Sequence, residues 1–189
     1  MRIRDPRDLV LAVVAFNKGQ KVKGRTVLQK LAYFLNEKLT LGLEFRPHYY
    51  GPYSESVAMA ISSLVAIDFL TEKEEALPGA STDMFEARKY TYELTQAGKE
   101  VVEKLQQLEP EVLGKIKAAM EEITTKEECS YECLSLAAKM FHILKSQGKR
   151  VTESQLSDIA KDLGWQLGKQ EIETAAKFLK GLGLIMEAS

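Results

Sequence analysis

The chain has 189 residues, of which 45% are hydrophobic and 28% are charged, a composition that excludes disordered and fibrous proteins and allows one or two domains. The 26 Lys and Arg residues oppose 27 Asp and Glu residues, so the net charge is −1 and a strongly basic nucleic-acid binder is excluded. No apolar run approaches the roughly 20 residues that span a bilayer, and the N-terminus lacks the apolar core of a signal peptide. We therefore expect a cytoplasmic protein with no membrane partner.

Two helices are predicted first. Asp5 followed by Pro6 is a favourable pair for the start of a helix, and an apolar stripe then continues to Phe16. Thr26 and Gln29 have the T-x-x-Q spacing of a capping box, which predicts the start of a second helix with one apolar side.

A third helix and two strands are predicted next. The aromatic stretch before Gly51 is irregular and ends in a turn, and Ser54 is a suitable N-cap for the third helix. Residues 69–71 are expected to be extended, and residues 89–94 alternate as a strand does. This order is that of a winged helix-turn-helix domain, so we expect a mainly α fold with a small antiparallel β-hairpin.

Three motifs carry a resemblance to a known family. They are Leu28-Gln29-Lys30-Leu31 with the aromatic residues after it, Gly51-Pro52-Tyr53-Ser54, and Leu94-Thr95-Gln96-Ala97-Gly98. Together they resemble the YwgA-like group of bacterial and archaeal winged-helix proteins, and the first two are similar to the Panacea domain found in antitoxins. The resemblance covers roughly residues 5–105 and implies the fold first and a function only second, because a fold does not dictate an activity.

The predicted third helix departs from a simple helix-turn-helix. A turn of about 3 to 4 residues joins the second and third helices of that motif, whereas residues 39–53 intervene here. Residues 54–63 include one acidic residue and no basic residue. Their serines would supply few of the contacts that read DNA bases, and a packing or protein-binding helix is the alternative.

A long helical stretch follows Gly98, and Pro110 can begin a new helix within it. Apolar residues recur there at spacings of three or four, which is typical of a dimer seam or of packing within one domain. We expect a homodimer. The recurring residues are Val101, Leu105, Leu108, Val112, Ile116, Met120 and Ile123.

Three further helices are predicted in the remainder of the chain. Thr152 and Gln155 form a second T-x-x-Q capping box, and Trp165 is expected in a core. We therefore divide the chain into a winged-helix domain with a long C-terminal helix at residues 1–124 and a smaller, helix-turn-helix-like three-helix domain at residues 125–189.

Residues that would support metal binding or catalysis are few. Cys129 and Cys133 with His142 would supply at most three ligands, so we expect no metal and no cofactor. Neither a nucleophile motif nor a phosphate-binding glycine loop is present in the sequence. We expect no catalytic residues and no enzyme activity.

His48 lies among Tyr49, Tyr50 and Tyr53, where a titratable ring meets several phenols. A packed aromatic hairpin is the first interpretation of this cluster. A ligand or partner pocket formed by these four residues is the second.

The leading hypothesis is a DNA-binding transcriptional regulator, and the alternative is a protein-interaction module, antitoxin-like or adaptor. Residues 1–50 hold ten Lys and Arg against four Asp and Glu, a density that suits phosphate contact if the side chains converge. One contiguous positive face would favour double-stranded DNA, and dispersed charge would favour a protein partner. The predicted nucleic-acid-binding residues are Lys21, Lys23, Arg25, Lys30, Ser54, Ser56, Arg88 and Lys89.

Overall fold

Helices make up most of the computed structural model, which describes residues 5–76, 88–125 and 130–186. The expected mainly α fold with a small antiparallel sheet is confirmed. Within the described residues, the helices are α1 (Pro6–Phe16), α2 (Arg25–Leu39), α3 (Glu55–Ala66), α4 (Gln96–Leu108), α5 (Pro110–Thr124), α6 (Tyr131–Gln147), α7 (Glu153–Asp162) and α8 (Lys169–Gly181).

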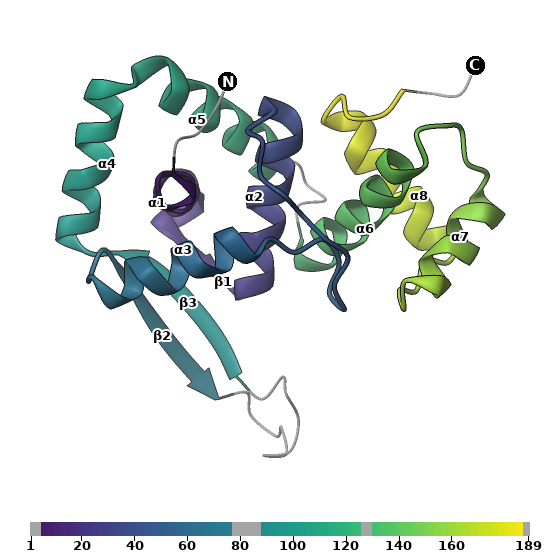
Figure 1. The fold of residues 1–189 in the computed structure, drawn as a ribbon, viewed down its shortest axis with the longest axis horizontal. Helices are drawn as coiled ribbons and strands as arrows, with labels where there is room; N and C mark the ends of the chain where they lie inside the picture. The colour runs from purple at the N-terminus through teal and green to yellow at the C-terminus, as the bar shows by residue number, and fades with distance from the viewer. Residues whose placement is uncertain (1–4, 77–87, 126–129, 187–189) are drawn as a thin grey trace.

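Helix α1 is the centre of the larger part of the molecule. Figure 1 shows it nearly end-on, with α2, α3, α4 and α5 around it. The predicted start of this helix is confirmed, because the Asp5 carboxylate accepts a hydrogen bond from the backbone N–H of Arg7 and Pro6 occupies the first turn. Every residue from Leu9 to Val14 is buried, as expected for a helix that is apolar all round.

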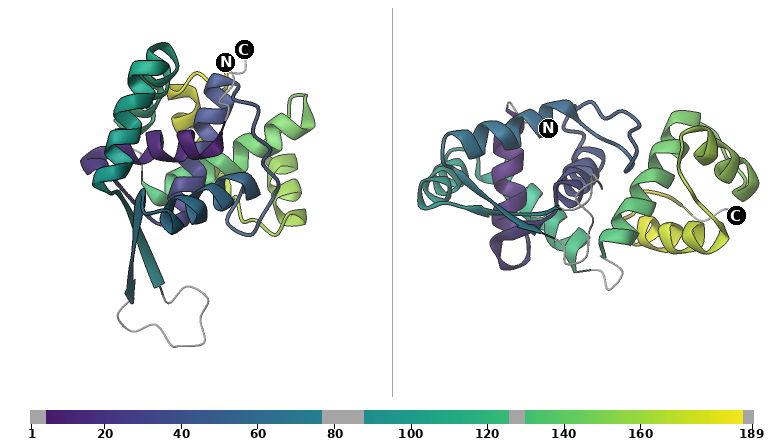
Figure 2. Two further views of the ribbon diagram at one scale, coloured as in Figure 1. Left: turned by 60° about the vertical axis from the view of Figure 1, so that its left-hand side comes forward. Right: turned by 90° about the horizontal axis from the view of Figure 1, so that it is seen from below.

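The sheet has three antiparallel strands rather than the two predicted. Strand β1 (Lys21–Lys23) lies beside β3 (Arg88–Leu94), which lies beside β2 (Leu70–Ala76). Strand β1 is too short for its alternation to be visible in the sequence. The β2–β3 hairpin extends away from the helices (Figure 2). One face of the sheet is buried at Val22, Leu70 and Tyr92, and the opposite face carries charged side chains.

The C-terminal half of the apolar stripe predicted as a dimer seam packs inside the chain. The chain turns at Glu109, so α4 and α5 are two helices that contact α1 on different sides (Figure 1). Ile116, Met120 and Ile123 of α5 are at most 1% exposed. Packing within one domain therefore accounts for the α5 part of the stripe, whereas Leu108 at the end of α4 is 78% exposed, and the expected homodimer stays a prediction.

Replacing Ile116 by Asp is expected to unfold the protein rather than to release a soluble monomer. The substitution would place an unpaired carboxylate among the buried side chains of α5, at a cost of several kcal/mol. Loss of the cooperative unfolding transition by circular dichroism checks this. If Ile116→Asp instead stays folded and light scattering gives it a smaller mass than the wild type, the predicted dimer seam would be supported.

The C-terminal helices α6, α7 and α8 form a second group on the far side of α2 (Figures 1 and 2). The predicted capping box of α7 is confirmed, because Thr152 and Gln155 exchange both hydrogen bonds. Buried residues of both groups belong to one continuous hydrophobic core. The division between residues 124 and 125 stays a prediction, and residues 126–129, which follow it, lie outside the described residues.

Candidate functional site

Two motifs that carry the family resemblance bind each other across the chain. The Gln29 side-chain amide donates to the Ser54 carbonyl at 2.9 Å, and the Ser54 backbone N–H donates to Gln29 Oε1 at 3.0 Å. The capping box predicted from Thr26 and Gln29 is therefore wrong: Gly24, with φ 105°, is the N-cap of α2, and no side chain caps that end. Because Ser54 is 1% exposed, its predicted nucleic-acid contact is also wrong.

Lys30 is buried beneath the turn formed by Gly51 and Pro52. Its Nζ donates to the Pro52 carbonyl at 2.7 Å. Gly51 has φ 97°, and a Cβ at this position would lie 3.2 Å from Lys30 Nζ and 3.1 Å from the side chain of Lys139, so the turn requires glycine here. Burial, with Lys139 nearby, lowers the pKa of Lys30 to about 7. The predicted phosphate contact by Lys30 is wrong, since the side chain is inaccessible.

The guanidinium of Arg25 binds side chains of strands β2 and β3. Its Nη2 donates to both carboxylate oxygens of Glu72 at 3.1 Å, its Nε donates to the Tyr92 hydroxyl at 2.9 Å, and its guanidinium lies 3.8 Å from the centre of the Tyr90 ring. Tyr92 in turn donates to Glu72. Burial opposes the charge of Arg25, but the bonds from Tyr92 and Glu72 outweigh it and raise the pKa of Arg25. A phosphate would have to break this pair to reach Arg25.

The exposed face of the sheet gathers lysines from all three strands. Lys21 and Lys23 of β1 are exposed, and the strand register places them on the same face as Lys73 of β2 and Lys89 of β3. Glu75 and Glu93 lie on this face as well, and Lys73 binds Glu93 at 2.9 Å. The structure therefore brings together three of the predicted residues, Lys21, Lys23 and Lys89. The side chain of Arg88 lies outside the described residues.

The exposed side of α3 is uncharged over most of its length. Met59 is 68% exposed, and Ile67, just after the helix, is 48% exposed. Ser62 and Ala66 are exposed between them. Glu55 is the sole charged residue in residues 54–67. Ser56 is exposed as well, and its hydroxyl is 2.9 Å from that of Ser54.

The aromatic cluster before the turn ties the two groups of helices together. His48 packs on Tyr53, with ring centroids 5.0 Å apart, and Tyr49 packs edge-on against Tyr50 at 4.8 Å. The His48 carbonyl accepts a hydrogen bond from the Trp165 indole N–H at 2.7 Å. The four rings thus pack in two pairs, with His48 and Tyr49 exposed, and the predicted ligand or partner pocket of these four residues stays a prediction.

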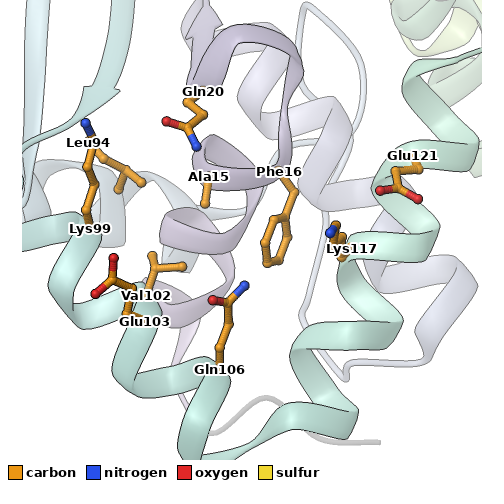
Figure 3. Close-up of a pocket in the computed structure, with 10 residues that line it drawn as sticks. All are labelled: Ala15, Phe16, Gln20, Leu94, Lys99, Val102, Glu103, Gln106, Lys117 and Glu121. Atoms are coloured by element: carbon orange, nitrogen blue, oxygen red, sulfur yellow. The ribbon is translucent and has the colours of Figure 1, made fainter.

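A hollow of about 420 Å³ lies between the end of α1 and the facing sides of α4 and α5, and Figure 3 shows its lining side chains. Lys99 and Glu103 come from α4, and Lys117 and Glu121 come from α5, so both walls carry both charges. Among the residues described there, none is a serine, cysteine or histidine. The hollow is therefore lined by lysine and glutamate side chains of both signs, which favour neither a cationic nor an anionic ligand.

Metal ligands are not clustered in the part of the chain that the structure describes. No three His, Cys, Asp or Glu side chains meet there in a way that would hold an ion. Cys133 is buried in α6, and Cys129 lies outside the described residues.

Comparison with known proteins adds no relative. No family model matches the chain, and a search of curated proteins finds no match either. Across residues 5–76, 88–125 and 130–186, none of the helices has the length and apolar character needed to cross a membrane.

Proposed function

We propose that this chain is a winged-helix module that binds another protein through the exposed side of α3. The winged-helix assignment is supported by the element order α1, β1, α2, α3, β2, β3 and by a sheet in which β3 lies between β1 and β2. In this arrangement α3 has the position of the recognition helix, and the β2–β3 hairpin has the position of the wing.

The composition of the exposed side of α3 carries the proposal. A helix that reads DNA presents Arg, Lys, Asn or Gln to base edges and phosphates. Residues 54–67 contain none of these. Exposed methionine with few charges is instead typical of the core of a protein interface. The exposed side of α3 has this composition, because Met59 and Ile67 are exposed and the exposed residues between them, Ser62 and Ala66, are small and uncharged.

Burial and ion pairing of several predicted DNA contacts also favour a protein partner. Lys30 and Ser54 are buried, and Arg25 is neutralised by Glu72. Lys30 and Arg25 are therefore not free to join Lys21 and Lys23 in one positive face. The loss of these two cations from the predicted surface favours a protein partner over a duplex.

Replacing Met59 by Glu is expected to abolish capture of the partner from an extract of the host cell. A charged residue at the centre of an apolar interface costs 2 kcal/mol or more, which is about a 30-fold loss of affinity. The measurement is quantitative mass spectrometry of proteins retained by the immobilised full-length chain. Lys73→Glu, on the sheet, is the matched control and should retain the partner. A protein that is retained equally by the wild type and Met59→Glu contradicts the proposal.

Duplex DNA is the second candidate, favoured by the four lysines on the exposed face of the sheet. If these lysines bind phosphates, duplex affinity should fall with salt at a log-log slope of about −0.9 per contact. Replacing Lys21, Lys23 and Lys89 together by Ala should flatten that slope, and Arg25→Ala should leave it unchanged because Arg25 is already paired. Fluorescence anisotropy at several salt concentrations measures both slopes. If the triple substitution leaves the slope unchanged, these lysines do not contact the phosphates and the sheet is not the DNA-binding surface.

A further inference from the structure

The exposed residues of α3 form one stripe along the helix. Four of them recur at spacings of four, three and four residues: Glu55, Met59, Ser62 and Ala66. Residues at these spacings lie on one side of a helix, and the same spacing makes the seam along which two helices pack. Helix α3 lies on the outside of the larger group of helices (Figure 2), a position in which a second helix can pack along it.

Small side chains make up most of this stripe. Ser62 and Ala66 extend little beyond the backbone of α3, whereas Met59 is 68% exposed. Packed helices have axes about 8 to 10 Å apart, and small residues at the contact allow the closer approach. Small residues on one helix pack best against large ones on the other, and the flexible methionine side chain adapts to such a neighbour. The stripe therefore fits a helix whose contacting side chains are large and aliphatic.

A carboxylate lies at each end of the stripe. Glu55 begins α3, and Asp68 directly follows the exposed Ile67. Both acidic side chains are exposed, and neither carboxylate has a hydrogen bond or an ion pair within the described part of the chain. Residues 54–68 contain no Lys, Arg or His. Because a helix rises 1.5 Å per residue, the two acidic positions are roughly 20 Å apart, and both ends of the surface are negative.

We propose that the partner segment bound by α3 is an amphipathic helix with large aliphatic residues on its contacting side and Lys or Arg at both ends. Its aliphatic side chains would pack against Met59, Ser62 and Ala66, and its basic residues would pair with Glu55 and Asp68. Since both ends of the stripe are acidic, a parallel and an antiparallel partner helix need the same chemistry. This inference rests on the proposed function, because it names the partner of the same surface.

Two synthetic helical peptides test the charge of the partner. Both have about 18 residues, long enough to cover the stripe, with alanine as the background and leucine at the contacting positions, and they differ in having lysine or glutamate at both ends. We expect the lysine-ended peptide to bind the full-length chain about 10-fold more tightly at low salt, and the difference to shrink as salt rises. Fluorescence anisotropy of labelled peptides of equal helicity measures this. Equal affinities at low salt, or tighter binding of the glutamate-ended peptide, would overturn the inference.

Removal of the two carboxylates is expected to abolish the preference between the peptides. Glu55→Gln with Asp68→Asn keeps the shape of both side chains, and Asn tolerates the φ of 59° at position 68 as Asp does, so the fold should be kept. Glu111→Gln with Glu121→Gln removes the same charge from exposed positions of α5 and is the matched control that should retain the preference. A preference that survives the loss of Glu55 and Asp68 would contradict the proposed pairing.

Met59→Glu separates this inference from the proposed function. If both peptides bind equally and Met59→Glu abolishes both complexes, α3 is a protein-binding surface and only the basic partner is overturned. If Met59→Glu leaves binding of the lysine-ended peptide unchanged, the peptide does not bind the stripe and the inference is overturned. If neither peptide binds at about 1 mM, the inference is also overturned, while loss of the captured partner from Met59→Glu still supports the proposed function.

Discussion

Replacing Lys30 by Met is expected to stabilise the protein at pH 6 and to remove most of the increase in its stability between pH 7 and 9.5. In the unfolded chain this lysine has a pKa near 10.5, whereas burial lowers the pKa of Lys30 to about 7 in the folded protein. Between these values the unfolded state holds the extra proton, so the free energy of unfolding rises with pH by about 1 kcal/mol per pH unit. Below pH 7 both states are protonated and the whole penalty for the buried charge is present.

Methionine has no charge to bury, so it escapes this penalty. The Pro52 carbonyl loses its donor in the variant, which costs about 1 to 3 kcal/mol. The net effect expected at pH 6 is therefore a gain of about 2 kcal/mol. Chemical denaturation at several pH values measures it, and Lys23→Met is the control for loss of an exposed lysine. If the free energy of unfolding changes with pH in the same way for the wild type and Lys30→Met, the buried charge of Lys30 does not cause the pH dependence.

Local patterns predicted the helices well because their causes lie within a few residues. Asp5 and Pro6 begin α1, Pro110 begins α5, and Thr152 with Gln155 begins α7, as their sequence positions indicate. Each of these arrangements depends on backbone groups within one helical turn. For that reason no knowledge of the rest of the fold was needed.

The candidate sites depend on contacts between distant parts of the chain, which no local pattern encodes. Gln29 has the spacing of a capping residue, but its amide is taken by Ser54, 25 residues later. Arg25 was predicted to contact nucleic acid, but its guanidinium forms an ion pair with Glu72, 47 residues later in the chain. The absence of basic residues near α3 was visible in the sequence, whereas the side of α3 that is exposed depends on the packing of α3 against α1.

Replacing Trp165 by Ala is expected to cost about 3 to 5 kcal/mol of stability, the usual cost of deleting a large buried aromatic side chain. The Trp165 side chain is 1% exposed, and its indole N–H bonds the His48 carbonyl, 117 residues away in the chain. Its predicted place in a core is confirmed. The substitution would leave a cavity in the C-terminal group and would also free the hairpin that carries His48.

The same substitution tests whether the two groups of helices unfold together. The rings of Phe34 in α2 and Phe178 in α8 are 5.6 Å apart, and Lys38 of α2 donates to the Leu182 carbonyl at 2.8 Å. Because the core is continuous across these contacts, we expect one cooperative transition in the wild type and one transition at lower denaturant in Trp165→Ala. Trp165→Phe keeps most of the buried area and should lose about 1 kcal/mol with the hydrogen bond. Two separate transitions, with only one moved by Trp165→Ala, would instead show that residues 125–189 fold as an independent domain.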